Sequence, residues 1–64
     1  MTVQSIERVF DIIELLSEEY KGIQLTEISR RLNLHKSTVY RLLNVLRKRG
    51  YIEKSEHNLY RIGI

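Results

Sequence analysis

The fold is decided by residues 25–46, which read LTEISRRLNLHKSTVYRLLNVL. Ile28 and Leu32 fall on one face of a short helix that we expect over residues 26–32. Beyond it, apolar residues again recur at spacings of three and four, which predicts a longer helix over residues 35–49. Two helices joined by a turn of a few residues, the second rich in polar and basic side chains, are typical of a helix-turn-helix unit.

The residues around the turn suit these helix ends. We expect the Thr26 hydroxyl to cap the first helix, where Glu27 also suits the positive end of the helix dipole. Asn33 tolerates the left-handed backbone conformation that ends a short helix, and Leu34 can then turn inward. Ser29 is small at the point where the two helices should approach most closely. The segment therefore supplies both the apolar contacts and the turn of the unit.

The flanking segments complete a small domain. Residues 4–19 have the apolar period of an amphipathic helix, but their apolar arc exceeds the roughly 100° that one core requires. The excess either wraps the small core or meets a second body, and the pattern leaves both open. Residues 51–63 contain two short aromatic and β-branched segments around a polar tip, which predicts a β-hairpin packed on the helices. The expected fold class is mostly α with a small β-hairpin, in which a first helix and the hairpin flank the helix-turn-helix unit.

Length and composition exclude several classes of protein. Sixty-four residues form one domain with no room for a large internal pocket. There is no cysteine, and His35 and His57 lie far apart, which argues against disulfides, thiol chemistry and a zinc site. No apolar stretch approaches the roughly 20 residues of a membrane span. We expect a cytoplasmic protein without a targeting leader, without enzyme activity and without a cofactor.

The net charge of +3 is divided unevenly along the chain. Residues 1–27 carry a net charge of −4 and residues 28–64 a net charge of +7. Such polarity in a small domain indicates one face that attracts polyanions and another that does not.

The helix over residues 35–49 is expected to present an almost wholly polar face opposite its apolar side. Arginine can bind guanine bidentately, asparagine can bind adenine, and serine or threonine can read either base edge. We therefore expect Ser37, Thr38, Tyr40 and Arg41 to lie nearest the bases of DNA, with the hairpin of residues 51–63, the wing, on backbone or minor groove. The candidate DNA-binding residues are Thr26, Lys36, Ser37, Thr38, Tyr40, Arg41, Asn44, Arg47, Lys54, His57, Asn58 and Arg61.

Ordinary surface helices also show a basic polar face, so this pattern alone does not decide the function. His57 by itself is read more readily as an exposed loop histidine than as a groove contact. Arg30 and Arg31 are expected to be solvated or to touch phosphates rather than to read bases. The alternative function is a winged helix used for protein–protein contact, against which the basic outer face argues, since protein interfaces deplete lysine.

Five segments in this order and spacing resemble the N-terminal domain of IclR-family transcriptional regulators of bacteria and archaea. They are residues 3–8 (VQSIER), 25–28 (LTEI), 36–43 (KSTVYRLL), 49–52 (RGYI) and 60–63 (YRIG). The resemblance covers essentially the whole chain. It implies a winged helix-turn-helix whose recognition helix corresponds to residues 35–49, and a homodimer on a roughly palindromic operator of double-stranded DNA, with residues 4–19 as a candidate contact between the two copies.

The resemblance also implies a larger effector-binding domain after the wing. We expect that domain to be absent from residues 1–64, so a small-molecule effector would act only through it. Three positions depart from the family pattern. His35 stands where proline is frequent at the helix start, and Ser29 and Asn33 stand where alanine and glycine are frequent. These residues keep the small size and the turn, so they put only local stability in doubt.

Overall fold

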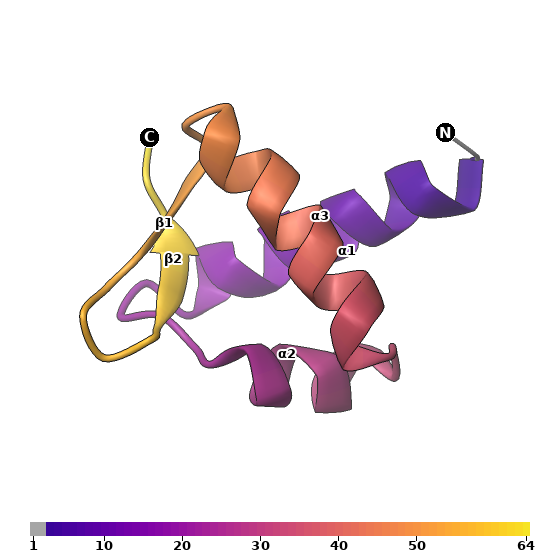
Figure 1. Cartoon of the computed structure of the whole chain (residues 1–64), viewed down its shortest axis with the longest axis horizontal. Coiled ribbons are helices and arrows are strands. Elements are labelled where there is room, and N and C mark those ends of the chain that lie inside the picture. The colour runs from indigo at the N-terminus through magenta and orange to yellow at the C-terminus, as the bar shows by residue number, and fades with distance from the viewer. Residues whose placement is uncertain (1–2) are drawn as a thin grey trace.

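The computed structural model describes residues 3–64, which form three helices followed by a two-stranded antiparallel hairpin (Figure 1). The elements are α1 (Val3–Glu18), α2 (Leu25–Leu32), α3 (Lys36–Lys48), β1 (Ile52–Lys54) and β2 (Tyr60–Ile62). The predicted fold class is thus confirmed. Helix ends lie within one residue of those expected from the sequence, and the strands are shorter than the segments that predicted them.

Helix α1 buries only part of its wide apolar arc. Ile12 and Leu16 are fully buried, whereas Ile6 and Phe10 are 45% and 56% exposed. Because these side chains remain exposed, part of the apolar arc does not pack on the core. The expectation that this part meets a second body stays a prediction.

Thr26 does not cap α2, and that prediction is wrong. The N-cap is Gln24, whose backbone is extended (φ −78°, ψ 154°) and whose side chain makes no capping hydrogen bond. The carbonyl of Gln24 accepts the N–H groups of Glu27 and Ile28, each at 3.0 Å. These bonds start the helix one residue earlier than expected and leave Thr26 exposed in the first turn.

The turn between α2 and α3 follows the prediction. Asn33 takes the left-handed conformation (φ 55°, ψ 48°), which a short polar side chain tolerates. Leu34 then donates its N–H to the carbonyl of Ser29 at 3.0 Å, and the Ser29 hydroxyl donates to the carbonyl of Leu34. Ser29 therefore stabilises the turn through these two hydrogen bonds, in addition to being small between the two helices.

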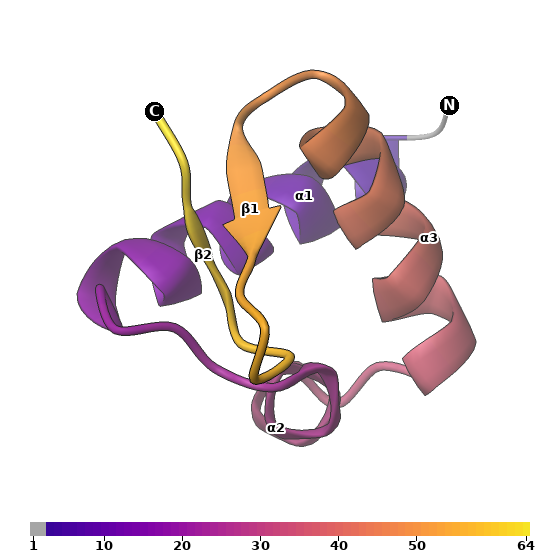
Figure 2. The ribbon, with the colours of Figure 1, turned by 60° about the vertical axis from the view of Figure 1, so that its left-hand side comes forward.

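The hairpin packs its inner face on the helices. Ile52 pairs with Ile62 and Lys54 pairs with Tyr60 in the antiparallel register, and Ile52 and Tyr60 are almost fully buried. Tyr60 also exchanges two backbone hydrogen bonds with Ile23, at 3.0 and 2.8 Å. This bridge ties the segment between α1 and α2 to the hairpin, which lies across one side of the helices in Figure 2.

One apolar cluster holds the domain together, and each helix and each strand contributes to it. Within residues 3–64 its buried members are Ile12, Leu16, Ile23, Ile28, Val39, Leu43, Leu46, Ile52 and Tyr60. No polar side chain is buried among the described residues. Polar and charged groups therefore remain at the surface, where they can meet a ligand.

Candidate nucleic-acid interface

Helix α3 carries most of the predicted site residues. Lys36, Ser37, Arg41 and Arg47 are exposed, and Tyr40 is 51% exposed. Thr38 and Asn44 are half-buried at the edges of this face, because the opposite side of the helix buries Val39, Leu43 and Leu46 in the core. The 3.6-residue period therefore turns the predicted readers outward.

The N-terminal end of α3 has no side-chain cap. Its N-cap is His35, which has an extended backbone (φ −64°, ψ 144°) and makes no capping hydrogen bond through its imidazole. The first backbone N–H groups of a helix have no partner within the helix, and together with the helix dipole they favour an anion. Lys36, in the first turn, adds a positive charge there.

On its wing side, α3 is bordered by a groove of about 340 Å³. Four predicted residues line it, namely Thr26 of α2, Tyr40 of α3, and Lys54 and Asn58 of the hairpin. The Lys54 ammonium nitrogen lies 5.5 Å from the centre of the Tyr60 ring, a cation–π contact that holds the charge near the groove. The fold thus brings together residues that are far apart in the sequence.

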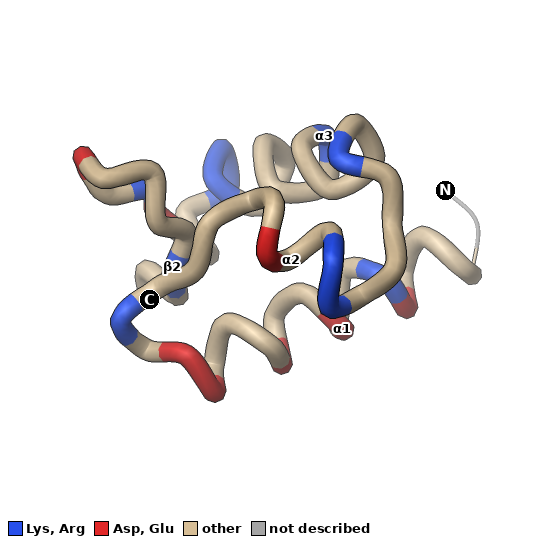
Figure 3. Tube along the Cα trace, turned by 90° about the horizontal axis from the view of Figure 1, so that it is seen from below, with Lys and Arg blue, Asp and Glu red and all other residues tan. Residues whose placement is uncertain are grey.

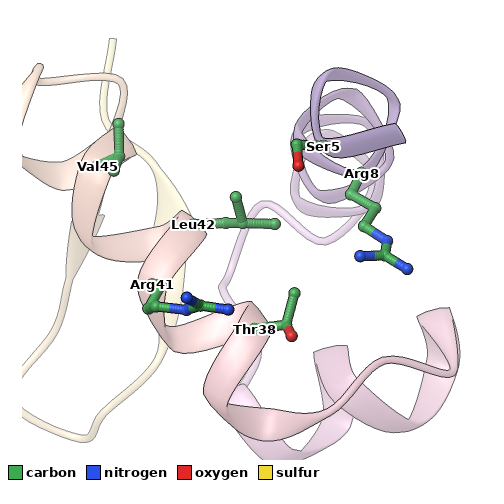
Figure 4. Close-up of a pocket in the computed structure, with 6 residues that line it drawn as sticks. All are labelled: Ser5, Arg8, Thr38, Arg41, Leu42 and Val45. Carbon is green, nitrogen blue, oxygen red and sulfur yellow. The ribbon is translucent and has the colours of Figure 1, made fainter. Parts of the chain in front are cut away.

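On its other side, α3 faces α1 across a groove of about 250 Å³ (Figure 4). Arg8 of α1 lines this groove together with Thr38 and Arg41 of α3. Arg8 also lines a neighbouring groove of about 450 Å³ beside His35 and the turn. Arg8 is not among the residues predicted to bind DNA, because its place beside α3 depends on how α1 and α3 pack.

Further along α3, Asn44, Arg47 and Lys48 line a separate hollow of about 390 Å³. It continues the polar face toward the C-terminal end of the helix. The hairpin tip does not join either groove through His57, whose side chain is 80% exposed and has Glu56 at 3.9 Å. Asn58 alone connects the tip to the groove on the wing side.

Three arginines near the interface are held by carboxylates. Arg61 donates to Glu53 across the hairpin, with 2.6 Å between its Nε and Oε1 of Glu53. Arg30 and Arg31 both donate to Glu27, and Arg31 also reaches Glu19 at 3.0 Å. Arg30 and Arg31 are thus paired with carboxylates on the surface of the domain, which agrees with the expectation that they do not read bases.

The two arginines also change the acidity of Glu27. Hydrogen bonds, from Arg30 first and then from Arg31, lower the pKa of Glu27 from 4.5 to about 2. The carboxylate consequently stays ionised over the range in which proteins normally work.

The charges separate in space as the sequence predicted. Figure 3 shows acidic residues along α1 and basic residues along α3. No group of three or more histidine, cysteine or acidic residues among residues 3–64 could hold a metal ion. No helix in that range is long and apolar enough to cross a membrane.

Comparison with known proteins decides the family. The model of the IclR helix-turn-helix domain matches residues 5–56. The chain belongs to the IclR family. It is 38% identical over 63 residues to the HTH-type transcriptional regulator XynR of Escherichia coli (strain K12). The aligned residues make up 97% of this chain and 25% of XynR. It is 39% identical over 64 residues to KdgR of the same organism, covering 98% of this chain and 24% of KdgR.

A solved structure supports the same assignment. The crystal structure of an IclR transcriptional regulator from Alicyclobacillus acidocaldarius superposes on the whole chain with a TM-score of 0.90, at 29% identity and over 26% of that protein. The present chain thus spans about a quarter of the length of these relatives. The comparisons confirm the family and the winged-helix fold. The two named relatives are transcriptional regulators, and none of the comparisons favours the protein-interaction alternative.

Proposed function

We propose that this IclR-family domain binds double-stranded DNA in a sequence-specific manner, with α3 in the major groove and the hairpin on the backbone or minor groove. The observation that carries the proposal is the setting of α3. Its polar face is exposed, and a groove borders it on the wing side and another on the α1 side. An inserted helix needs this arrangement, because the two DNA backbones must pass on either side of it.

We assign base contacts to the outward side chains of α3. Arg41 is suited to guanine and Asn44 to adenine, while the hydroxyls of Ser37, Thr38 and Tyr40 can serve either a base edge or a phosphate. The exposure of Tyr40 and Arg41 supports this assignment. Asn44 is half-buried, so we assign it a contact at the margin of this face.

Backbone contacts are assigned to residues around that surface. Thr26 and Lys54 share the groove on the wing side, and Lys36 and Arg47 lie at the two ends of α3. At the wing, Asn58, His57 and Arg61 are the proposed contacts. Arg61 would first have to leave Glu53. This is a small cost of about 0–1 kcal/mol, since both side chains are near half-exposed.

We propose that the domain binds a roughly palindromic operator as a homodimer through the apolar side of α1. An almost wholly apolar groove of about 240 Å³ runs between α1 and α3, and exposed Ile6, Phe10, Val45 and Tyr51 line it. Exposed apolar surface that continues into a groove is typical of a protein interface. Two-fold symmetry in the protein would then be mirrored in the operator.

The remaining proposals concern the whole protein. We propose a cytoplasmic location, because the regulators to which the chain is similar act on bacterial transcription. No cofactor is assigned. Response to a small-molecule effector, which the family resemblance places in a larger domain, is assigned to no residue of this chain.

The salt dependence of DNA binding tests the proposed function. Each neutralised phosphate contributes about −0.9 to the slope of log K against log salt, so six contacts should reduce affinity roughly a thousandfold between 50 and 200 mM salt. A steep slope supports DNA binding. A shallow slope, with tight binding to a protein partner instead, would favour the protein-interaction alternative.

A further inference from the structure

Arg8 is a cation that the assigned DNA contacts leave unused. It is the only basic residue of α1, whose sequence VQSIERVFDIIELLSE contains four acids. Its side chain is half-buried, and none of the ion pairs found within residues 3–64 involves it. By contrast, Arg30, Arg31 and Arg61 are each held by a carboxylate. The fold therefore partly buries Arg8 but pairs it with no carboxylate of the described residues.

The position of Arg8 is beside the recognition helix. It lines both grooves on the α1 side of α3, and Thr38 lines both with it. Figure 4 shows Arg8 on α1 and Thr38 and Arg41 on α3, on either side of the space between the two helices. Polar residues of two helices thus line one groove.

The chemistry of these grooves suits an anion. Their described lining contains two guanidinium groups, those of Arg8 and Arg41, together with hydroxyl, amide and imidazole groups, and it contains no carboxylate. A guanidinium binds a phosphate through a planar pair of N–H donors. With no carboxylate to compete, an external phosphate is the natural partner of Arg8.

A cation supplied by another element then lies on each side of α3. Lys54 supplies the cation on the wing side, and Arg8 supplies the cation on the α1 side. When a helix lies in the major groove, a DNA strand passes along each of its sides. One cation per side would hold the helix in register between the two strands.

We propose that Arg8 of α1 donates to a backbone phosphate of the DNA strand that passes α3 on its α1 side. The inference rests on the proposed function, because it presupposes that α3 enters the major groove. It makes α1 a part of the DNA interface, in addition to its core and dimer roles. Arg8 carries no sequence information in this arrangement, whereas Arg41 beside it reads a base.

Equilibrium binding of the chain to duplexes at 50 to 200 mM salt tests this assignment. Arg8→Ala should weaken binding to every duplex alike and lower the magnitude of the log–log slope by about 0.9 for each bound chain, hence by about 1.8 for the proposed homodimer. The ratio of wild-type to variant affinity should therefore shrink about 3.5-fold per bound chain, or about 12-fold for the dimer, over this fourfold change in salt. Arg8→Lys, which retains the charge, should keep the wild-type slope.

Two further variants serve as references for Arg8→Ala. Lys21→Ala removes the same charge from the exposed turn after α1 and should leave the slope nearly unchanged. Arg41→Ala should instead weaken binding to the preferred duplex about 5- to 150-fold more than to one with its base changed. Thermal melting should show that Arg8→Ala and Lys21→Ala are equally folded.

Two outcomes would overturn the inference about Arg8 alone. One is a wild-type affinity and slope in Arg8→Ala. The other is a change of preference at a single base pair, which would make Arg8 a reader rather than a phosphate contact. A wild-type chain without salt-dependent DNA binding would overturn the proposed function together with this inference.

Discussion

Glu27 holds together the charges on the outer side of α2. It accepts hydrogen bonds from Arg30 at 3.0 and 2.6 Å and from Arg31 at 2.8 Å. These are pairs three and four residues apart, so the sequence spacing places them on one side of the helix. The contact of Arg31 with Glu19 joins this cluster to the end of α1.

The depressed pKa of Glu27 predicts a specific acid sensitivity. Because its pKa falls from 4.5 in the unfolded chain to about 2 in the folded chain, its contribution to stability is complete above about pH 4.5 and is lost as the pH falls through 2. Glu27→Gln should therefore show a shallower loss of unfolding free energy between pH 4.5 and 2 than the wild type. Urea unfolding at a series of pH values measures this.

Glu14→Gln is the matched control for Glu27→Gln. Glu14 is exposed on α1, and its carboxylate enters none of the ion pairs found in the described part of the chain. The control should keep the wild-type pH dependence. Equal pH dependence in both variants would contradict the assignment.

Single residues also show where sequence reasoning succeeds and fails. Asn33 was predicted correctly because its left-handed backbone follows from its own side chain. Thr26 was assigned wrongly as the cap because several adjacent residues could start the helix, and the hydrogen bonds to Gln24 decide among them. Arg8 was overlooked because its place beside α3 depends on how two helices cross, which local periodicity does not contain.

At the scale of elements, Gly22 joins the helices to the hairpin. Its backbone has φ +100°, and a Cβ added there would lie 2.9 Å from the Cβ of Leu59 and 3.1 Å from the carbonyl oxygen of Tyr60. The close approach of the hairpin could not be predicted from the sequence, since residues 59 and 60 are distant from Gly22 in the chain.

Gly22→Ala should destabilise the domain more than Gly50→Ala does. Gly50 also has a positive φ, of +83°, but no atom lies within 4 Å of its added Cβ, so it isolates the cost of the backbone conformation. That cost is about 1–3 kcal/mol, and Gly22→Ala should add the clash to it. Chemical denaturation measures both. Equal losses would show that the hairpin moves away without cost.

At the scale of the whole molecule, the apolar surface of α1 is the feature that the isolated chain leaves uncovered. Val3 is 74% exposed and Phe10 56% exposed, although residues as apolar as these usually lie inside. The sequence predicted the excess width of this surface. It could not predict which side chains the core would cover, because that depends on where α3 and the hairpin dock.

Phe10→Ser should weaken the proposed dimer without unfolding the domain. Because Phe10 is more than half exposed in the single chain, its loss removes more contact from the dimer than from the core. Burial of a phenylalanine is worth about 1.5–3 kcal/mol, which corresponds to a dimer dissociation constant raised roughly 10- to 100-fold. Analytical ultracentrifugation, with and without an operator duplex, measures the change.

Tyr20→Ser is the control for Phe10→Ser, because Tyr20 is 78% exposed in the turn after the C-terminal end of α1. It should leave association unchanged. If both variants associate like the wild type, the apolar side of α1 is not the dimer contact.

The fold class and the position of α3 could be predicted from the sequence because both follow from local apolar period and turn chemistry. The two grooves that border α3 could not, since each one joins α3 to a distant segment of the chain. The hairpin supplies Lys54 to one groove, and α1 supplies Arg8 to the other. The exposed polar face of α3 was thus predicted along the helix, whereas the grooves on its two sides required the three-dimensional structure.

Selection of bound duplexes from a random DNA pool tests the central claim most directly, because it makes no assumption about the operator. If α3 reads bases as a symmetric pair, the selected duplexes should share one motif in two inverted copies, with centres separated by about 10–10.5 base pairs or a multiple of that distance. Selected sequences that cannot be distinguished from the starting pool would contradict sequence-specific recognition by this domain.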